Sequence, residues 1–330
     1  MPKGTNQKLK LYHLGQIMLE KTDDDHYLTM AEIKEELERY EVTADRKSLY
    51  DDLQTLGKFG IEVTGEPVGK SYHYHVTNKQ FEIAELKLLV DAIQSSKFIT
   101  ERKSNELIRK LEQFASHYEA QQMNRQVVMS GRVKTMNESI YYNVDHIHTA
   151  INENKQISFE YMNWNLKKEL VPRHEERYTT SPWALSWDDE NYYLIGYSSN
   201  NEQIKHYRVD KMQKIKILEE KRDGRNVFRD LNVAEHAKAS FGMFGGEITD
   251  VRLRCANSMA GVIIDRFGKE IMLRPDGSDH FITNVRVTVS GQFLGWVFAL
   301  GPLVRIEGPA EVVREMKEAL KTLSASYKGA

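Results

Sequence analysis

The sequence has one cysteine, no long apolar run and no excess of charge of either sign. Cys255 has no partner for an internal disulfide, which fits a reducing compartment. No apolar stretch approaches the length of a membrane span, and the first residues lack the apolar core of a secretory signal, so we expect a cytoplasmic protein. The 46 Lys and Arg nearly balance the 48 Asp and Glu, and 40% of the residues are hydrophobic, which is typical of soluble folded proteins.

Motifs of catalytic and metal-binding sites are also missing. The sequence contains no G-x-x-x-x-G-K-[ST] phosphate loop, no G-x-S-x-G, no H-E-x-x-H and no paired-cysteine motif. His73 and His75 would share one face of a strand, but no further ligands stand nearby at metal-binding spacing, which favours an aromatic sheet surface. Cys255 lies in an alternating VRLRCA run and is expected to be a packed thiol. We therefore expect no enzyme activity, no metal and no cofactor.

What the sequence does contain is a pattern of short helices near its start. Apolar residues at helical spacing predict a first amphipathic helix through Leu11, Leu14, Ile17 and Met18. Thr29 and Glu32 can form a reciprocal capping box at the start of a second helix. The buried face of this second helix is expected to hold Ile33, Leu37 and Tyr40.

A third helix and a pair of strands are predicted directly after these two helices. Thr43, at the end of a turn over residues 41–43, can cap a helix whose inward stripe is Leu49, Leu53 and Leu56. Residues 61–63 and 72–76 then alternate like paired strands, and residues 65–71 between them would form a wing. This order of elements predicts a winged helix-turn-helix over residues 1–78, a fold that binds DNA.

The outward face of the third helix supplies the candidate DNA-binding residues. Side chains with hydrogen-bonding ends at the start of such a helix reach base edges and phosphates, and a lysine at the wing tip suits a phosphate. The candidates are Arg46, Lys47, Ser48, Tyr50, Gln54, Lys58 and Lys70, with Arg46 and Lys47 first among them. Each lysine alone is better explained as a solvated surface charge, and only their joint placement favours DNA.

Charge limits how this region can bind DNA. Residues 1–80 hold eleven Lys and Arg against fourteen Asp and Glu, so affinity must come from a local patch. Asp51 on the same outer face would repel phosphate, although a carboxylate can accept a hydrogen bond from cytosine. A homodimer would double the contacts to a double-stranded operator, and we expect one.

The composition and the spacing of apolar residues divide the rest of the chain into four further segments. Two helical stripes over residues 79–142 suggest a connector or dimerisation region, and short β-rich runs over 143–222 suggest a small barrel or sandwich. Residues 223–247 are expected to form a linker. Residues 248–330 alternate strands and helices in an order that matches a ferredoxin-like split β-α-β domain with a final helix, which Pro309 would start.

Two aromatic segments and the C-terminal tail carry a family resemblance. They read NYYLIGY, HYRVDKM and GQFLGWVFALGPLVRIEGP, and together with the predicted winged helix they resemble the WYL-domain transcriptional regulators over almost the whole chain. The family's Trp-Tyr-Leu triplet appears here as Tyr192-Tyr193-Leu194, so its first position departs from the pattern while remaining aromatic. Lys211 stands where a second arginine is usual, which weakens bidentate recognition of phosphate.

The resemblance implies a multidomain α+β protein in which a Sm/SH3-like WYL barrel senses an effector, either single-stranded nucleic acid or a nucleotide-like anion. Cations beside aromatic side chains suit phosphates and stacked bases. The candidate effector-binding residues are Arg173, Tyr192, Tyr193, Tyr207, Arg208 and Lys211. Aromatics that alternate along a strand are equally typical of a core, so both roles stay open for each tyrosine.

We therefore expect a homodimeric DNA-binding transcriptional regulator that responds to an effector. Two alternatives remain open. One is an adaptor that recruits another protein through its C-terminal domain and has no effector. The other is a nucleic-acid-processing enzyme docked by the winged helix, for which the sequence offers no catalytic constellation.

Overall fold

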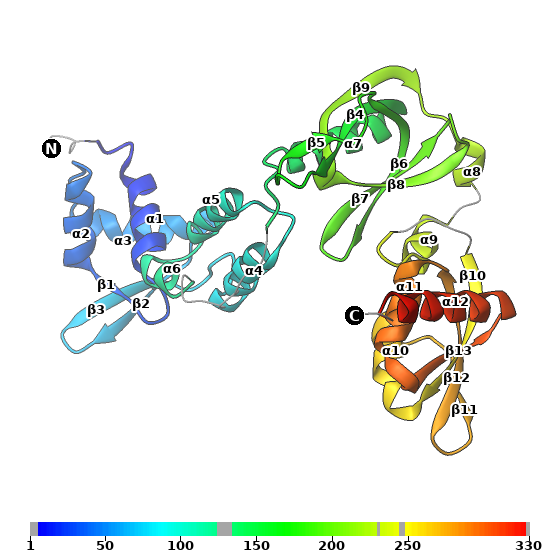
Figure 1. Ribbon diagram of the computed structural model, residues 1–330. Coiled ribbons are helices and arrows are strands. Elements are labelled where there is room, and N and C mark those ends of the chain that lie inside the picture. The colour runs from blue at the N-terminus through cyan, green and yellow to red at the C-terminus, as the bar shows by residue number, and fades with distance from the viewer. Residues whose placement is uncertain (1–5, 124–133, 230–231, 244–247, 328–330) are drawn as a thin grey trace. The chain divides into compact units, whose positions relative to one another are not determined.

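The chain forms a multidomain α+β structure with two compact units, Met1–Met136 and Asn137–Ala330. The structure is a computed structural model that describes residues 6–123, 134–229, 232–243 and 248–327 (Figure 1). Each unit is described by itself below. Among the described residues, no helix has the length and apolar character needed to cross a membrane.

The N-terminal unit begins with three helices and a small sheet. In chain order these elements are α1 (Lys10–Lys21), β1 (Leu28–Thr29), α2 (Met30–Arg39), α3 (Arg46–Leu56), the 3-10 turn η1 (Gly57–Phe59), β2 (Val63–Val68) and β3 (Ser71–Val76). The sheet is antiparallel with the order β1-β3-β2. The predicted inward stripes are largely confirmed, because the core contains Leu14, Ile17, Met18, Ile33, Leu37, Leu49, Leu53 and Leu56.

The N-terminal cap of α2 is the one predicted from the sequence, whereas the cap of α3 is a different residue from the one predicted. The Thr29 hydroxyl accepts a hydrogen bond from the Glu32 amide, and the Thr29 amide donates to the Glu32 carboxylate at 2.7 Å, which confirms the capping box. The cap predicted at Thr43 is wrong. Asp45 caps α3 instead and accepts from the Ser48 amide at 3.0 Å, since a carboxylate is a stronger acceptor at the positive end of a helix.

Tyr40 corrects the predicted inward face of α2. The helix ends at Arg39, and Tyr40 follows in a non-helical conformation with 42% of its surface exposed. Its ring stacks on His13 of α1 at 4.4 Å between ring centroids. The residue therefore covers the outside of the core rather than filling it.

The hairpin β2–β3 is longer than the sequence suggested. Residues 65–71 were expected to be a loop, but both strands have six residues and only Gly69 and Lys70 form the turn. Pro67 obscures this strand in the sequence because proline cannot donate to a ladder. It is tolerated because β2 is the edge strand of the sheet. Lys70 lies exposed at the tip, as predicted.

A second helical group follows within the same unit. It consists of α4 (Ile83–Ser95), α5 (Glu101–Glu112) and α6 (His117–Met123), of which α6 was not predicted. The helices share a core of Leu86, Val90, Ile108, Ala115 and Met123. Buried Asp23, after α1, joins the two groups, because it accepts hydrogen bonds from the Ser116 hydroxyl and from His26 Nδ1. Hydrogen bonding holds the pKa of Asp23 below its usual value even though burial opposes this.

The C-terminal unit begins with one helix and a six-stranded antiparallel sheet. The elements are α7 (Ile140–Asn152), β4 (Lys155–Trp164), β5 (Leu170–Pro172), β6 (Tyr178–Asp188), β7 (Asn191–Ser198), β8 (Gln203–Arg208), the 3-10 turn η2 (Val209–Lys211) and β9 (Met212–Lys221). The strand order is β5-β4-β6-β7-β8, and β9 also pairs with β4. The helix α7, which was not predicted, contacts β4, β6 and β9.

A strand-rich domain with a buried cysteine ends the chain. After α8 (Arg225–Arg229) and α9 (Val233–Ala239), its elements are β10 (Ile248–Ala256), η3 (Asn257–Met259), α10 (Ala260–Phe267), β11 (Arg274–Asp276), β12 (His280–Thr288), α11 (Gly291–Ala299), η4 (Gly301–Leu303), β13 (Val304–Gly308) and α12 (Ala310–Ser326). The antiparallel order β11-β12-β10-β13 is the order that a split β-α-β arrangement produces. Cys255 is fully buried in β10, and burial raises its pKa to about 11, so it is a packing residue.

Candidate nucleic-acid interface and effector site

The outer face of α3 is open to solvent. Its inward side is filled by three leucines, and the opposite side presents the exposed residues Arg46, Lys47, Tyr50, Asp51 and Gln54, with Lys58 in the following turn. An 11-residue helix with one apolar stripe leaves this second side without a packing role. The residues predicted to contact DNA therefore lie together on one surface, apart from Ser48 and Lys70.

The Ser48 side chain makes its contacts between helices rather than at the outer surface. It is half-buried, and its hydroxyl accepts a hydrogen bond from Lys10 Nζ of α1 at 3.1 Å. Lys10 also forms an ion pair of 2.5 Å with Asp52 of α3. These contacts fix α3 against α1, so they set the angle at which the outer face of α3 is presented.

Arg46 and Tyr50 form a hydrogen-bonded pair one turn apart on α3. Arg46 Nε and Nη2 both donate to the Tyr50 hydroxyl, each at 3.0 Å. These bonds raise the pKa of Arg46 and lower that of Tyr50. The Tyr74 ring of β3 meets the Tyr50 ring edge to face at 6.4 Å between centroids, and burial raises the Tyr74 pKa to about 12. The start of α3 is thereby connected to the hairpin.

The predicted effector residues divide between the two faces of the C-terminal unit's first sheet. Tyr193 pairs with Arg208 on one face, and its ring packs with Ile195 and Phe228. Tyr207 pairs with Leu194 and points to the other face, where its ring contacts Phe159 at 5.1 Å between ring centroids. Tyr192 shares this second face by alternation and makes an edge contact with Trp187. The structure therefore does not bring all the predicted tyrosines to one site.

Arg208 is already engaged by an acidic side chain. Its Nε and Nη2 donate to the two carboxylate oxygens of Asp210 at 3.0 and 2.8 Å, and Nη2 also donates to Asn191. This bidentate pair raises the pKa of Arg208. The Arg208 amide donates to the Tyr161 hydroxyl. The positive charge of Arg173 also acts on this hydroxyl. Arg208 and exposed Arg173 thus lie around Tyr161, and half-buried Lys211 follows in η2.

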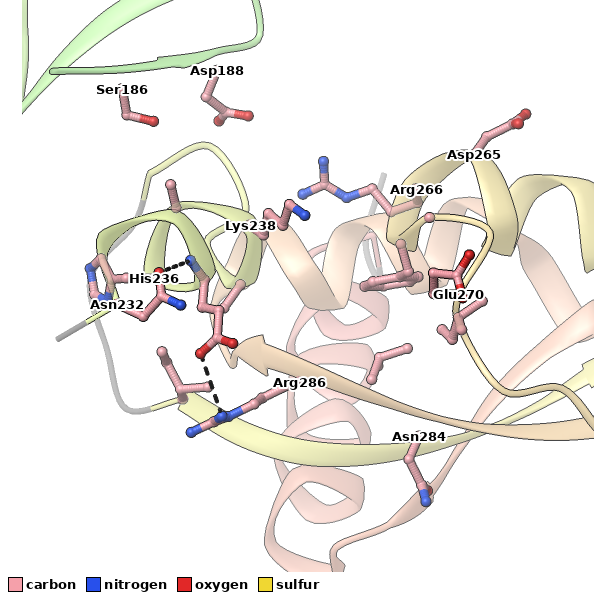
Figure 2. Close-up of a pocket in the computed structure, with 18 of the residues that line it drawn as sticks. Ser186, Asp188, Asn232, His236, Lys238, Asp265, Arg266, Glu270, Asn284 and Arg286 are labelled. Atoms are coloured by element: carbon pink, nitrogen blue, oxygen red, sulfur yellow. Dashed lines mark hydrogen bonds and ion pairs between the residues drawn. The ribbon is translucent and has the colours of Figure 1, made fainter. Parts of the chain in front are cut away.

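A separate cavity of about 840 Å³ lies in the same unit, and none of the predicted effector residues lines it. Figure 2 shows Ser186 and Asp188 of β6 above α9, with Arg266 beside that helix and Arg286 below it. Asp188 accepts from the Gly242 amide, but its second oxygen is buried without a hydrogen-bond partner among the described residues, and burial raises its pKa. The sequence gives no sign of this cavity, because its walls come from several short segments spread between residues 186 and 286, with no local motif.

The described residues contain no group of three or more His, Cys, Asp or Glu arranged to hold a metal ion. His75 is buried and makes an edge contact with Tyr27 at 4.7 Å between ring centroids. The neighbouring His73 lies 6.1 Å from the same ring. Both histidines thus belong to an aromatic sheet surface.

Comparisons with known proteins identify two domains in the C-terminal unit. Residues 142–217 match the WYL domain, and residues 247–324 match the WCX domain. No curated protein sequence matches the chain.

The chain is also similar to solved structures. It is similar to proteasome accessory factor B/C (PafBC) of Arthrobacter aurescens, at 17% identity over 98% of this chain and 50% of that one, with a TM-score of 0.28. It is also similar to a CRISPR Cas-related protein, at 12% identity over 98% of this chain and 81% of that one, with a TM-score of 0.38. The chain spans half the length of PafBC. The C-terminal unit therefore contains a WYL domain followed by a WCX domain, in line with the resemblance to WYL-domain regulators seen in the sequence.

Proposed function

We propose that this protein is a transcriptional regulator that binds double-stranded DNA through α3. The exposed polar face of α3 carries the proposal. The order α1, α2, α3 and then the hairpin β2–β3 is that of a winged helix-turn-helix, in which the last helix enters the major groove and the hairpin reaches the adjacent backbone. Arg46, Lys47 and Gln54 would face the bases and nearby phosphates, and Lys70 would contact the backbone.

We also propose that the protein binds DNA as a homodimer. The N-terminal 80 residues are acidic overall, so a single copy has few cations for the DNA backbone. Two copies would place two α3 helices in successive major grooves and double the number of phosphates neutralised. The helical group α4–α6 is the proposed place of association, because Leu88 of α4 is 70% exposed.

Effector sensing in the WYL domain is the third part of the proposal. An anionic effector, such as single-stranded DNA or a nucleotide, would bind at Arg208, Arg173 and Lys211. It would have to replace the Asp210 carboxylate, which now occupies both donors on one edge of Arg208. Tyr193 and Tyr207 are buried, so stacking on either ring would require the sheet or its cover to move. Tyr192 is half-buried and more accessible.

Genome-wide mapping of bound DNA tests the regulatory function. The protein should occupy discrete positions upstream of genes when it is crosslinked in its own cells and the attached fragments are sequenced. Fragments distributed evenly along the chromosome would contradict a regulator.

The effector site is tested by thermal shift with a short single-stranded DNA. A ligand that binds only the folded state raises the melting temperature. The double substitution Arg208→Ala and Lys211→Ala should abolish the shift, whereas Lys216→Ala and Lys221→Ala, which remove two exposed lysines of β9, should keep it. A full shift in the first variant would exclude this site.

A further inference from the structure

Arg46 holds its guanidinium group in one orientation although the side chain is exposed. A guanidinium has five N–H donors arranged along three edges of a plane. One of those edges, formed by Nε and Nη2, is occupied by the Tyr50 hydroxyl through two bonds of 3.0 Å. The opposite end, where Nη1 and Nη2 each have a further hydrogen, points away from Tyr50. The pair therefore leaves one edge of two parallel donors available at the surface of α3.

Tyr50 is itself held by the hairpin. The Tyr50 ring meets the Tyr74 ring edge to face at 6.4 Å between centroids. Tyr74 is only 7% exposed and lies across the ladder from Gly65. A Cβ atom at position 65 would come within 2.7 Å of the Tyr74 ring, so glycine is what allows the ring to lie there. The orientation of Arg46 thus depends on a chain of contacts that starts in β2.

We propose that Tyr50 is a positioning residue that aims Arg46 at a guanine in the major groove. This inference rests on the proposed function of α3. Two parallel donors match the O6 and N7 acceptors of guanine, whereas adenine, cytosine and thymine each present a different pattern. Arg46 lies at the first position of α3, where a recognition helix contacts base edges.

The advantage of the arrangement is its low ordering cost on binding. An exposed arginine loses rotamer freedom when it docks, and a side chain that is already held loses less. Lys47, the other leading candidate, has a point charge on a flexible stem and suits a phosphate rather than one base. Arg46 and Tyr50 therefore determine sequence preference, and Lys47 contributes affinity without preference.

The test is selection from a duplex DNA library with a randomised central segment, followed by sequencing of the bound fraction. Wild type, Arg46→Ala, Tyr50→Phe and Tyr72→Phe are compared. Tyr50→Phe keeps the ring against Tyr74 and removes only the hydroxyl. Tyr72 is the matched control, since it is another exposed tyrosine stacked on Tyr74, but it lies in the hairpin. Melting temperatures check that each variant is folded.

We expect wild type to select a site with a guanine whose preference falls about tenfold in Arg46→Ala. Tyr50→Phe should weaken the preference at that same base pair and at no other, and Tyr72→Phe should match wild type. An unchanged Tyr50→Phe site, a weakening at a different base pair, or a uniform loss across the site would each overturn the positioning role. A wild-type protein that selects no sequence would contradict the proposed function, and with it this inference.

Discussion

His206 and His236 face each other with their Nε2 atoms 3.1 Å apart, one on β8 and the other on α9. At this distance one ring donates and the other accepts, so at least one ring is neutral. Burial, and for His206 also the neighbouring His236, lowers both pKa values, that of His206 to about 4. The contact joins the WYL sheet to a helix that lines the cavity. Its protonation therefore couples pH to the stability of this unit.

We predict that the C-terminal unit loses stability as pH falls from about 6.5 to 4. Over that range the unfolded chain binds a proton at His206 that the folded chain does not, so the free energy of unfolding decreases by on the order of 2–3 kcal/mol. The measurement is the melting temperature as a function of pH. His206→Gln should flatten the profile, and His148→Gln, an exposed histidine on α7, should not. Equal slopes in all three proteins would refute the role of this pair.

The helix α3 and the hairpin β2–β3 are joined through Tyr74 of β3, whose ring contacts Tyr50 of α3 and lies against Gly65 of β2. Gly65 provides the space for its ring. Gly57, at the end of α3, offers a matched control, since a Cβ atom there would meet nothing within 4 Å and its backbone is helical.

Gly65→Ala is expected to lower the free energy of unfolding by about 1–3 kcal/mol, because the new methyl group displaces the Tyr74 ring. Gly57→Ala should be neutral or slightly stabilising, since alanine is the better helix former. Urea unfolding of the two variants beside wild type measures the difference. If Gly65→Ala unfolds like wild type, the Tyr74 ring is not confined by β2.

Several elements could be predicted from the sequence because their signals are local. The capping box at Thr29 and the apolar stripes of α1 to α3 needed only spacing. The cap of α3 was placed at Thr43 in the prediction, because Thr43 and Asp45 are both good capping residues, and the stronger acceptor, Asp45, caps the helix. The prediction ended this strand at residue 63 and assigned residues 65–71, which include two glycines, to the wing. That Pro67 lies on an edge strand, where it is tolerated, is a tertiary property.

The candidate sites show the same division between local and non-local information. The face of α3 follows from helical periodicity, so its exposed residues were predictable. The Arg46–Tyr50 pair has the i, i+4 spacing of helix neighbours, and that signal could have revealed it. The contact of Tyr50 with Tyr74 arises from the packing of α3 on β3, and the hydrogen bond from Arg208 to Asn191 arises from strand register. The sequence alone provides neither.

We propose that two copies of the chain bind DNA together, because the N-terminal region is acidic overall. We predict that light scattering after size exclusion will give twice the mass of one chain. Leu88→Glu on α4 should shift the protein toward the monomer, because a charge placed in an apolar contact is costly. Lys87→Glu, a charge change at an exposed residue of the same helix, serves as the control. A strict monomer with and without DNA would exclude the dimer.

The most direct test of the account is a gel-shift titration on a duplex that the wild-type protein selects. Arg46→Ala with Lys47→Ala should weaken binding by at least about tenfold while the melting temperature stays unchanged, because both side chains lie outside the core. Lys216→Ala with Lys221→Ala removes the same number of positive charges, two, from β9, and this variant should bind DNA like wild type. Unchanged affinity in the α3 variant would contradict the claim that this helix contacts DNA.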